Sequence, residues 1–415
     1  MINEFYVFAG WQQDEIIGIV YREPANNGER ISFEFNNTWL KENSVFLDTE
    51  LQHFRGRQFP ANLIFGFLSD ASPDRWGRTL MDRREMLLAR EEKRRPRKMQ
   101  ESDYLLGVYD EGRTGGLRFS YSKAGPFESS APDMKTPPMV NLRALENAAI
   151  SLEKDKNIYE SKWLKMILYP GSSLGGARPK ANVVSPEGDL WIAKFPSMND
   201  TLDVGAWEMV AHDLAKKCGL NVPPAEVRKF SEHGSTYLVR RFDRYCKEGK
   251  QHRIHFASAM TMLGETDGTV NPVSYLDIAG VIEEQCREVE KNLREMWNRL
   301  LYTVLISNTD DHLRNHGFLL QNGMWSLSPA YDVNPTFDKD YLALNINEDS
   351  CYIDIETVLE VSEYFRIPIK EAKEIAGKMS RIINKEWRRI AGRYHITESE
   401  QDLMSSAFRE SLKYL

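Results

Sequence analysis

The chain has 415 residues, which is too long for one compact core, so two or three domains are expected. Its hydrophobic content of 41% and charged content of 28% are ordinary for a soluble globular protein. The formal net charge of -7 argues against broad electrostatic binding of nucleic acid by this chain alone.

The sequence predicts neither a targeting signal nor a disulfide framework. It contains no run of eighteen or more apolar residues, and its start lacks the charged and apolar regions of a signal peptide. The four cysteines are far apart and form no Cys-x-x-Cys pair: Cys218, Cys246, Cys286 and Cys351. We therefore expect a cytoplasmic protein with reduced thiols, no zinc ribbon and no membrane contact.

The first third of the chain predicts a small antiparallel sheet. Residues 5–8, 16–21 and 31–35 have strand patterns, and 117–121 follows a turn rich in Asp and Gly. Between them, residues 75–90 carry apolar side chains at helical spacing.

A segment rich in Pro, Gly and Ser, at 123–138, is predicted to be a linker because it cannot sustain a helix or sheet. A helix at 142–153 follows, and then a glycine loop, Gly-Ser-Ser-Leu-Gly-Gly-Ala-Arg-Pro-Lys, at 171–180. Small residues let backbone amides approach a phosphate, although a plain hairpin turn is the commoner role of such a cluster.

Two strands, 181–184 and 190–195, come directly after this loop. Lys194 lies in the second, in the position of the strand lysine that contacts the ATP phosphates in kinases. The alternative is a lysine on the sheet surface. Glu208, on the next predicted helix, has the spacing of the glutamate that positions such a lysine; its alternative is solvent exposure.

The following strand, 237–244, is where the hinge between two kinase lobes would fall. Beyond residue 256 the pattern becomes mainly helical. The helices that it predicts cover residues 276–289, 292–306, 369–381 and 398–412.

Polar residues with kinase spacing follow the second of these helices. Asp310 precedes Asn315 by five positions, and Asp332 comes after a short apolar strand and a turn. Kinases need an Asp to orient the attacking hydroxyl, an Asn for a magnesium ion and a later Asp for the metal that bridges the phosphates. The alternative is that 308–311 caps a helix and Asp332 lies in a turn bounded by prolines.

Taken together, these motifs resemble the HipA family of bacterial toxin kinases over nearly the full length. The most specific matches are Asn-Thr-Asp-Asp-His-Leu-Arg-Asn at 308–315, Pro-Ala-Tyr-Asp at 329–332, Leu-Asn-Val-Pro at 220–223 and Arg-Phe-Asp-Arg at 241–244. The resemblance implies an α+β, two-lobed kinase-like fold with an N-terminal β-rich subdomain. Its expected parts are 1–123, a linker at 124–138, a lobe with the glycine loop at 139–255 and a helical lobe at 256–415.

The resemblance also implies roles for individual residues, with ATP and Mg²⁺ as cofactors. Asp310 would be the catalytic aspartate that orients the substrate hydroxyl and accepts its proton, and Asn315 and Asp332 would hold the metal ion. ATP would contact Gly175, Gly176, Ala177, Arg178, Pro179, Lys180, Lys194, Arg240, Phe242, His312 and Tyr331, with 240–242 as the hinge. Ser173 would be autophosphorylated, with Ser172 as its alternative, and phosphate there would eject the glycine loop and silence the kinase.

By the same resemblance, the chain would be a serine/threonine kinase that acts as the toxin of a toxin-antitoxin pair. Its substrate would be an aminoacyl-tRNA synthetase. Its partner would be a HipB-like helix-turn-helix antitoxin, through which it would reach operator DNA. Two alternatives remain open at this point: a kinase for small molecules or lipids, and a catalytically idle corepressor.

Overall fold

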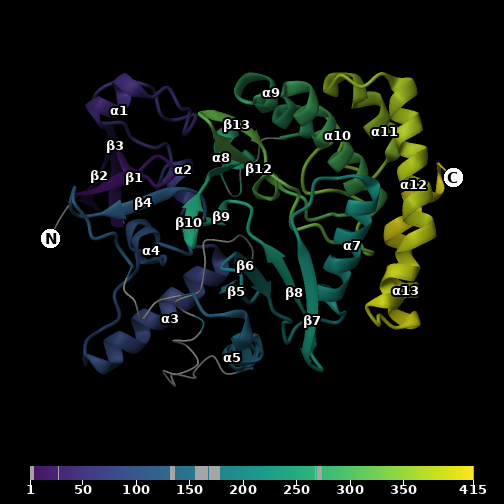
Figure 1. The fold of residues 1–415 in the computed structure, drawn as a ribbon, viewed down its shortest axis with the longest axis horizontal. Helices are drawn as coiled ribbons and strands as arrows, with labels where there is room; N and C mark the ends of the chain where they lie inside the picture. Colours follow the sequence, from purple (N-terminus) through teal and green to yellow (C-terminus); the bar gives the residue numbers. More distant parts are fainter. Residues whose placement is uncertain are drawn as a thin grey trace.

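The computed structural model describes residues 4–26, 28–130, 136–154, 167, 178–266, 268 and 273–414. Figure 1 shows an N-terminal sheet on one side of the molecule, a second sheet in the middle and helices on the opposite side. The predicted mixture of helix and sheet is confirmed, and the strands of the described residues fall into four sheets.

The N-terminal sheet is antiparallel, in the order β3-β2-β1-β4. Its strands are β1 (Glu4–Ala9), β2 (Glu15–Ala25), β3 (Gly28–Phe35) and β4 (Leu117–Ser120). Three short helices accompany it: α1 (Asn37–Glu42), α2 (Gly66–Ser69) and α4 (Glu101–Gly107). Apolar side chains on these elements, such as Phe5, Phe33 and Phe67, form one buried cluster. The four predicted strands are therefore present, because alternating patterns bury one face of each.

Helix α3 (Arg75–Glu91) connects this unit to the second sheet. Its first turn is capped by Asp74, which accepts a hydrogen bond from the amide of Gly77 at 2.7 Å. Trp76 and Leu80 on α3 pack into the same buried cluster as α5 (Leu142–Lys154) and the second sheet. The N-terminal unit and the second sheet therefore share a core.

The second sheet has the order β5-β6-β8-β7 and is also antiparallel. It contains β5 (Lys180–Val184), β6 (Leu190–Lys194), β7 (Ala225–Ser231) and β8 (Gly234–Arg240), and α7 (Val204–Cys218) packs on it. In its register, Lys194 lies opposite Lys180 on one side and Tyr237 on the other.

Two smaller sheets lead into the C-terminal part. A two-stranded ladder consists of β9 (Arg244–Lys247) and β10 (Lys250–Arg253), and a three-stranded sheet contains β11 (His255–Ser258), β12 (Gly317–Gln321) and β13 (Met324–Leu327). A short 3-10 helix, η3 (Leu313–Asn315), precedes β12. The polar 308–315 segment is therefore held between the end of a helix and a buried strand.

Helices form the rest of the C-terminal part: α8 (Ala259–Leu263), α9 (Tyr275–Gln285), α10 (Val289–Leu305), α11 (Ile355–Glu360), α12 (Ile369–Arg393) and α13 (Glu398–Met404), with 3-10 turns η4 (Val361–Phe365) and η5 (Ser405–Leu412). Three predicted helix lengths differ from the structure. The helix predicted at 276–289 ends at Gln285. The helix predicted at 369–381 continues to Arg393, with Ile383, Trp387 and Ile390 buried. The helix predicted at 398–412 becomes a 3-10 helix after Met404, where the Ser405 hydroxyl bonds the Asp402 carbonyl at 2.6 Å and competes with the α-helical pattern.

A buried ionic network joins the N-terminal unit to the end of β8. Arg241 donates to the carbonyl of Gly112 at 2.6 Å and to Asp243 at 2.6 Å, and Asp243 accepts the amide of Gly115 at 2.8 Å. Burial alone would raise the pKa of Asp243, but the two guanidiniums of Arg241 and Arg244 outweigh it and lower that pKa to about 2. The turn rich in Asp and Gly that precedes β4 therefore connects the N-terminal unit to the end of β8.

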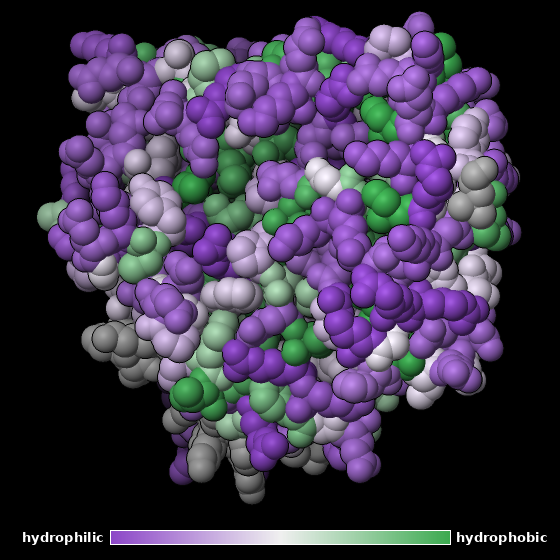
Figure 2. Space-filling model, turned by 45° about the vertical axis from the view of Figure 1, so that its right-hand side comes forward, coloured by the Kyte–Doolittle hydropathy of each residue, from purple (hydrophilic) through white to green (hydrophobic). Residues whose placement is uncertain are grey.

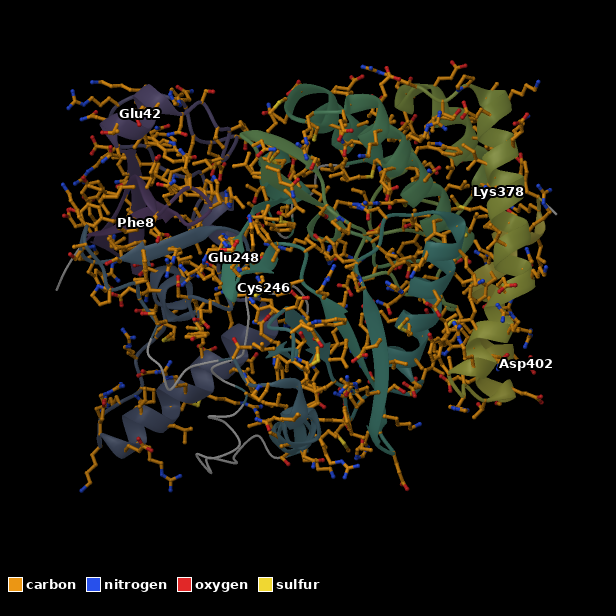
Figure 3. The ribbon with its side chains drawn as sticks, viewed as in Figure 1. Phe8, Glu42, Cys246, Glu248, Lys378 and Asp402 are labelled. Atoms are coloured by element: carbon orange, nitrogen blue, oxygen red, sulfur yellow. The ribbon has the colours of Figure 1, made fainter. Side chains whose placement is uncertain are left out.

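The outer surface is mostly hydrophilic on the face that Figure 2 shows, and its apolar side chains form small separate groups. On the helical side, Lys378 and Asp402 lie on the outer helices α12 and α13 (Figure 3). Among the described helices, none is long and apolar enough to span a membrane.

Candidate active site

Lys194 is the centre of the site. Its Nζ lies 2.5 Å from Glu208 Oε1 on α7 and 2.6 Å from Asp332 Oδ1. Glu208 and Lys194 come from neighbouring elements of one lobe, whereas Asp332 comes from the loop after β13. The structure therefore joins the lysine and the acid that the sequence places 138 residues apart.

The electrostatics of this cluster keep Lys194 and Asp332 charged. Burial opposes the charge on Lys194, but Asp332 and Glu208 outweigh it and raise the pKa of Lys194. Burial also opposes the charge on Asp332, but Lys194 lowers the pKa of Asp332 to about 2. Glu208 is the exception, since its burial raises its pKa despite the lysine.

Asp332 has a left-handed backbone, with φ of 57°. Aspartate tolerates this region better than most residues, and such conformations cluster at functional sites. The hydroxyl of the preceding Tyr331 donates a 2.6 Å hydrogen bond to the carbonyl of Arg314. The ring of Tyr331 also packs near the ring of Phe242, with centroids 5.4 Å apart. These contacts fix the loop that carries the acid.

The predicted catalytic segment lies between α10 and β12. Asp310 is exposed, and the Nδ2 of Asn315 donates to the Asp310 carbonyl at 3.1 Å. The expectation that 308–311 caps a helix is not met, since η3 begins after His312 without a side-chain cap. Instead, the hydrogen bond from Asn315 to the Asp310 carbonyl closes a compact loop.

Asp311, which the sequence argument did not use, anchors this loop. It is buried, accepts hydrogen bonds from the hydroxyls of Tyr275 and Thr303, and lies 3.2 Å from His316. Burial would raise the pKa of Asp311, but His316 outweighs it and lowers that pKa. The neighbouring Asp310 is thereby left at the surface. The sequence shows only that two acids are adjacent at 310 and 311, which does not tell which of them is buried.

A cavity of about 990 Å³ lies between the lobes. The C-terminal wall and the second sheet contribute Lys180, Ile192, Lys194, Glu208, Tyr237, Val239, Arg240, Arg241, Phe242, Asp243, His312, Asn315, Tyr331 and Asp332 to its lining. Apolar and aromatic residues such as Ile192, Val239 and Phe242 lie beside the charged cluster. Asp310 is not part of the lining.

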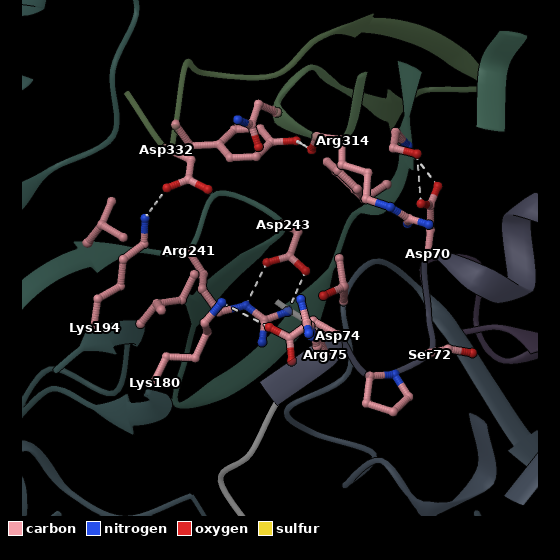
Figure 4. A pocket seen from close by; sticks show the side chains of 18 of the residues that line it. Asp70, Ser72, Asp74, Arg75, Lys180, Lys194, Arg241, Asp243, Arg314 and Asp332 are labelled. Atoms are coloured by element: carbon pink, nitrogen blue, oxygen red, sulfur yellow. Dashed lines mark hydrogen bonds and ion pairs between the residues drawn. The ribbon is translucent and has the colours of Figure 1, made fainter. Parts of the chain in front are cut away.

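The opposite wall comes from the N-terminal unit, which sequence reasoning had given no role in the site. It includes Asp70, Asp74, Arg75 and Arg78, and Figure 4 shows Asp70, Asp74 and Arg75 across the cavity from Lys194 and Asp332. The amine of Lys180 on β5 lies 2.9 Å from Asp74 of this wall, and both side chains are buried, so the pair joins the two walls. The sequence 69–74 resembles an ordinary helix cap, so only the packing reveals this wall.

The remaining predicted residues occupy different places. Ser172, Ser173, Gly175, Gly176 and Ala177 lie outside the described residues. The guanidinium of Arg178 pairs with Asp200 at 2.6 Å, and the Pro179 carbonyl accepts the amide of Phe195 at 2.9 Å. Arg240 ends β8, where its guanidinium is exposed and lies 3.4 Å from Asp189.

Comparison with known proteins places this geometry in a family. A chain of the Shewanella oneidensis MR-1 toxin-antitoxin complex of HipA, HipB and operator DNA has the same fold, with a TM-score of 0.72, 16% identity, and coverage of 99% of this chain and 96% of that chain. A family model for the HipA-like C-terminal domain matches residues 172–387, which is more than half of the sequence. This chain therefore belongs to the HipA-like family, as the sequence resemblance predicted.

Two curated relatives carry the name of an activity. A putative kinase of Haemophilus influenzae is 28% identical over 198 residues, which cover 42% of this chain and 57% of that protein. Putative kinase Y4dM of Sinorhizobium fredii is 29% identical over 178 residues, which cover 39% of this chain and 42% of that protein. The chain thus spans about half the length of the curated relatives it matches.

Proposed function

We propose that this chain is an ATP-dependent kinase that phosphorylates serine or threonine hydroxyls of a protein. The observation that carries the proposal is the Lys194 ammonium held between Glu208 and Asp332 in a cavity between two lobes. Kinases use a lysine paired with a helix glutamate for the nucleotide phosphates, next to an aspartate for the metal ion. The names of the two relatives agree with this chemistry.

The residues present fit ATP and Mg²⁺. Asp332 is ionised at neutral pH, and Asn315 uses its Nδ2 for the Asp310 carbonyl, so its Oδ1 remains for a cation. Within the described part of the chain, no cluster of three or more His, Cys, Asp or Glu side chains could hold a metal ion. This suits Mg²⁺, which commonly takes one or two protein ligands and completes its shell with phosphate and water oxygens.

In this proposal Lys194 binds the phosphates, and Asn315 and Asp332 hold the metal ion. Bound Mg²⁺ neutralises the charge that develops on the transferred phosphoryl group. The exposed Asp310 orients the incoming hydroxyl and accepts its proton. Phe242, His312 and Tyr331 border the nucleotide, with 240–242 as the hinge.

The regulatory part of the proposal concerns the glycine loop. Phosphate on Ser173, or on Ser172, would add nearly two negative charges where ATP places its own. The nucleotide would then be excluded, and the kinase would silence itself.

The biological role that we propose is the toxin of a toxin-antitoxin pair. Support comes from the fold shared with a chain of a complex that contains HipA, HipB and operator DNA. The partner would be a HipB-like antitoxin, and the substrate an aminoacyl-tRNA synthetase. We place the protein in the cytoplasm, where both would be found.

The test is phosphate transfer from labelled ATP by the purified chain and by its Asp310→Asn and Asp332→Asn variants. We expect each variant to lose activity by roughly a thousandfold, because Asp310→Asn loses the group that accepts the proton and Asp332→Asn loses a charged ligand of the metal ion. Asp402→Asn serves as the control, since Asp402 is exposed on α13. Undiminished activity in both site variants would overturn the proposal.

Mass spectrometry of the wild type after incubation with ATP tests the proposed type of acceptor. Phosphate on Ser172 or Ser173 supports a protein kinase. Transfer only to a small molecule or a lipid would replace it with that alternative.

A further inference from the structure

The segment after Asp332 lies next to Asp310, the proposed catalytic aspartate. The amide of Ala343 donates to the carbonyl of Thr309 at 3.0 Å, and the amide of Thr336 donates to the carbonyl of Ser307 at 3.0 Å. Thr309 directly precedes the exposed Asp310. Residues around position 343 therefore lie beside Asp310, one backbone hydrogen bond away.

Two large aromatic side chains of this segment are exposed. Tyr341 and Tyr352 face each other in an isolated antiparallel bridge and are 54% and 67% exposed. Their neighbours Leu342 and Ile353 are buried. Because side chains alternate in direction along extended chain, both tyrosines point outward. Neither ring contacts another ring or a cation among the described residues. These tyrosines contribute little to the core.

Four acidic side chains flank this pair in the sequence, and Lys339 is the exposed basic side chain among them, so the segment is negatively charged overall. Asp338, Glu348 and Asp349 are exposed, and no described residue forms an ion pair with them. Asp340 pairs with Arg409 at 2.5 Å but remains 72% exposed. We define the tyrosine-acid surface by its members, which are Asp338, Asp340, Tyr341, Glu348, Asp349 and Tyr352.

We propose that the tyrosine-acid surface docks a basic, extended segment of the acceptor protein, beside the hydroxyl that is phosphorylated. The inference rests on the proposed kinase function and specifies its substrate class. Lysine and arginine side chains bind the faces of tyrosine rings and pair with carboxylates, so one cationic segment satisfies both features. The negative charge disfavours an acidic segment or a nucleic acid. The hydrogen bond from the amide of Ala343 to the carbonyl of Thr309 joins this segment to the residue before Asp310, so a docked chain would run close to the acceptor hydroxyl.

The experiment uses fluorescently labelled peptides that hold one serine in an alanine-glycine background. Lysines, alanines or glutamates flank the serine in three otherwise identical peptides. We measure the Kd of each for the full chain by anisotropy, and the KM of each in phosphate transfer. The wild type is expected to bind the lysine peptide roughly tenfold more tightly than the glutamate peptide, and less so at high salt.

Two sets of substitutions separate the parts of the surface. The variant Tyr341→Ser/Tyr352→Ser removes the rings, and Asp338→Asn/Glu348→Gln/Asp349→Asn removes the free charges. Each is expected to raise Kd and KM for the lysine peptide severalfold, with KM for ATP unchanged. The control is Tyr364→Ser, because Tyr364 is a 66% exposed tyrosine on η4.

The binding measurement is independent of catalysis, so the two proposals fail separately. No preference for lysine over glutamate, or an undiminished preference in both surface variants, would overturn the docking proposal. A lysine preference that the variants lose, without phosphate transfer to any acceptor, would support docking and count against the kinase function.

Discussion

The ammonium of Lys194 lies 2.6 Å from the carboxylate of Asp332, and the contact joins strand β6 to a loop of the C-terminal lobe. Lys194 also holds Glu208, so one cation serves two acids from different lobes. The relative position of the lobes is thus coupled to the charge of a single side chain.

Replacement of Lys194 by Met should lower the free energy of unfolding by about 3 kcal/mol, because it leaves Glu208 buried without a counter-charge. The double variant Lys194→Met/Glu208→Gln should recover most of this loss, and neither should transfer phosphate. Urea unfolding with a parallel assay of phosphate transfer checks both statements. Equal stability of the single and double variants would show that the buried charge of Glu208 is not what destabilises Lys194→Met.

The pKa of Asp332 gives a prediction for acid conditions. It falls from 3.8 to about 2 in the fold, so this carboxylate stabilises the folded state above pH 3.8, and that contribution is lost as the pH falls toward 2. The difference in stability between wild type and Asp332→Asn should therefore be complete at pH 5 to 7 and shrink below pH 4. Chemical unfolding across this range measures it. A difference that stays constant down to pH 2 would contradict the ion pair.

His255 should control stability at milder pH. Its ring is buried, stacks on Trp11 with centroids 4.3 Å apart, and has a pKa lowered by burial from 6.5 to about 3. Below pH 6.5 His255 binds a proton in the unfolded chain but not in the folded chain. The free energy of unfolding therefore falls toward pH 3, by up to about 1.4 kcal/mol per pH unit. His255→Phe should flatten this part of the profile. An unchanged slope would mean that the ring accepts the proton when folded.

Gly205 and Gly280 form a matched pair of helical glycines. A Cβ at Gly205 would lie 2.1 Å from the carbonyl oxygen of Ser235, whereas a Cβ at Gly280 meets nothing within 4 Å. Gly205→Ala should therefore destabilise the protein by about 2 kcal/mol and weaken phosphate transfer, because α7 carries Glu208. Gly280→Ala should stabilise it by about 0.5–1 kcal/mol. Thermal unfolding of both variants would reveal whether the packing of α7 on β8 is as close as described.

The secondary structure could be predicted largely from local pattern. Alternation in β1 and helical spacing in α3 each report burial of one face, which neighbouring residues determine together. The predicted end of α12 was wrong because the helix continues through a charged stretch. Its buried residues there, Ile383 and Trp387, are too few to give a clear helical pattern.

The candidate site could likewise be predicted only in part from the sequence. The sequence by itself determined which chemical groups are available: the strand lysine, the spacing of Asp310 and Asn315, and the later acid Asp332. Only the tertiary structure decided that Asp74 meets Lys180, that Asp311 and not Asp310 is buried, and that the N-terminal unit forms a wall of the cavity. The physical reason is range. Periodicity records what each element buries, whereas the meeting of two charges from distant elements depends on how whole lobes pack.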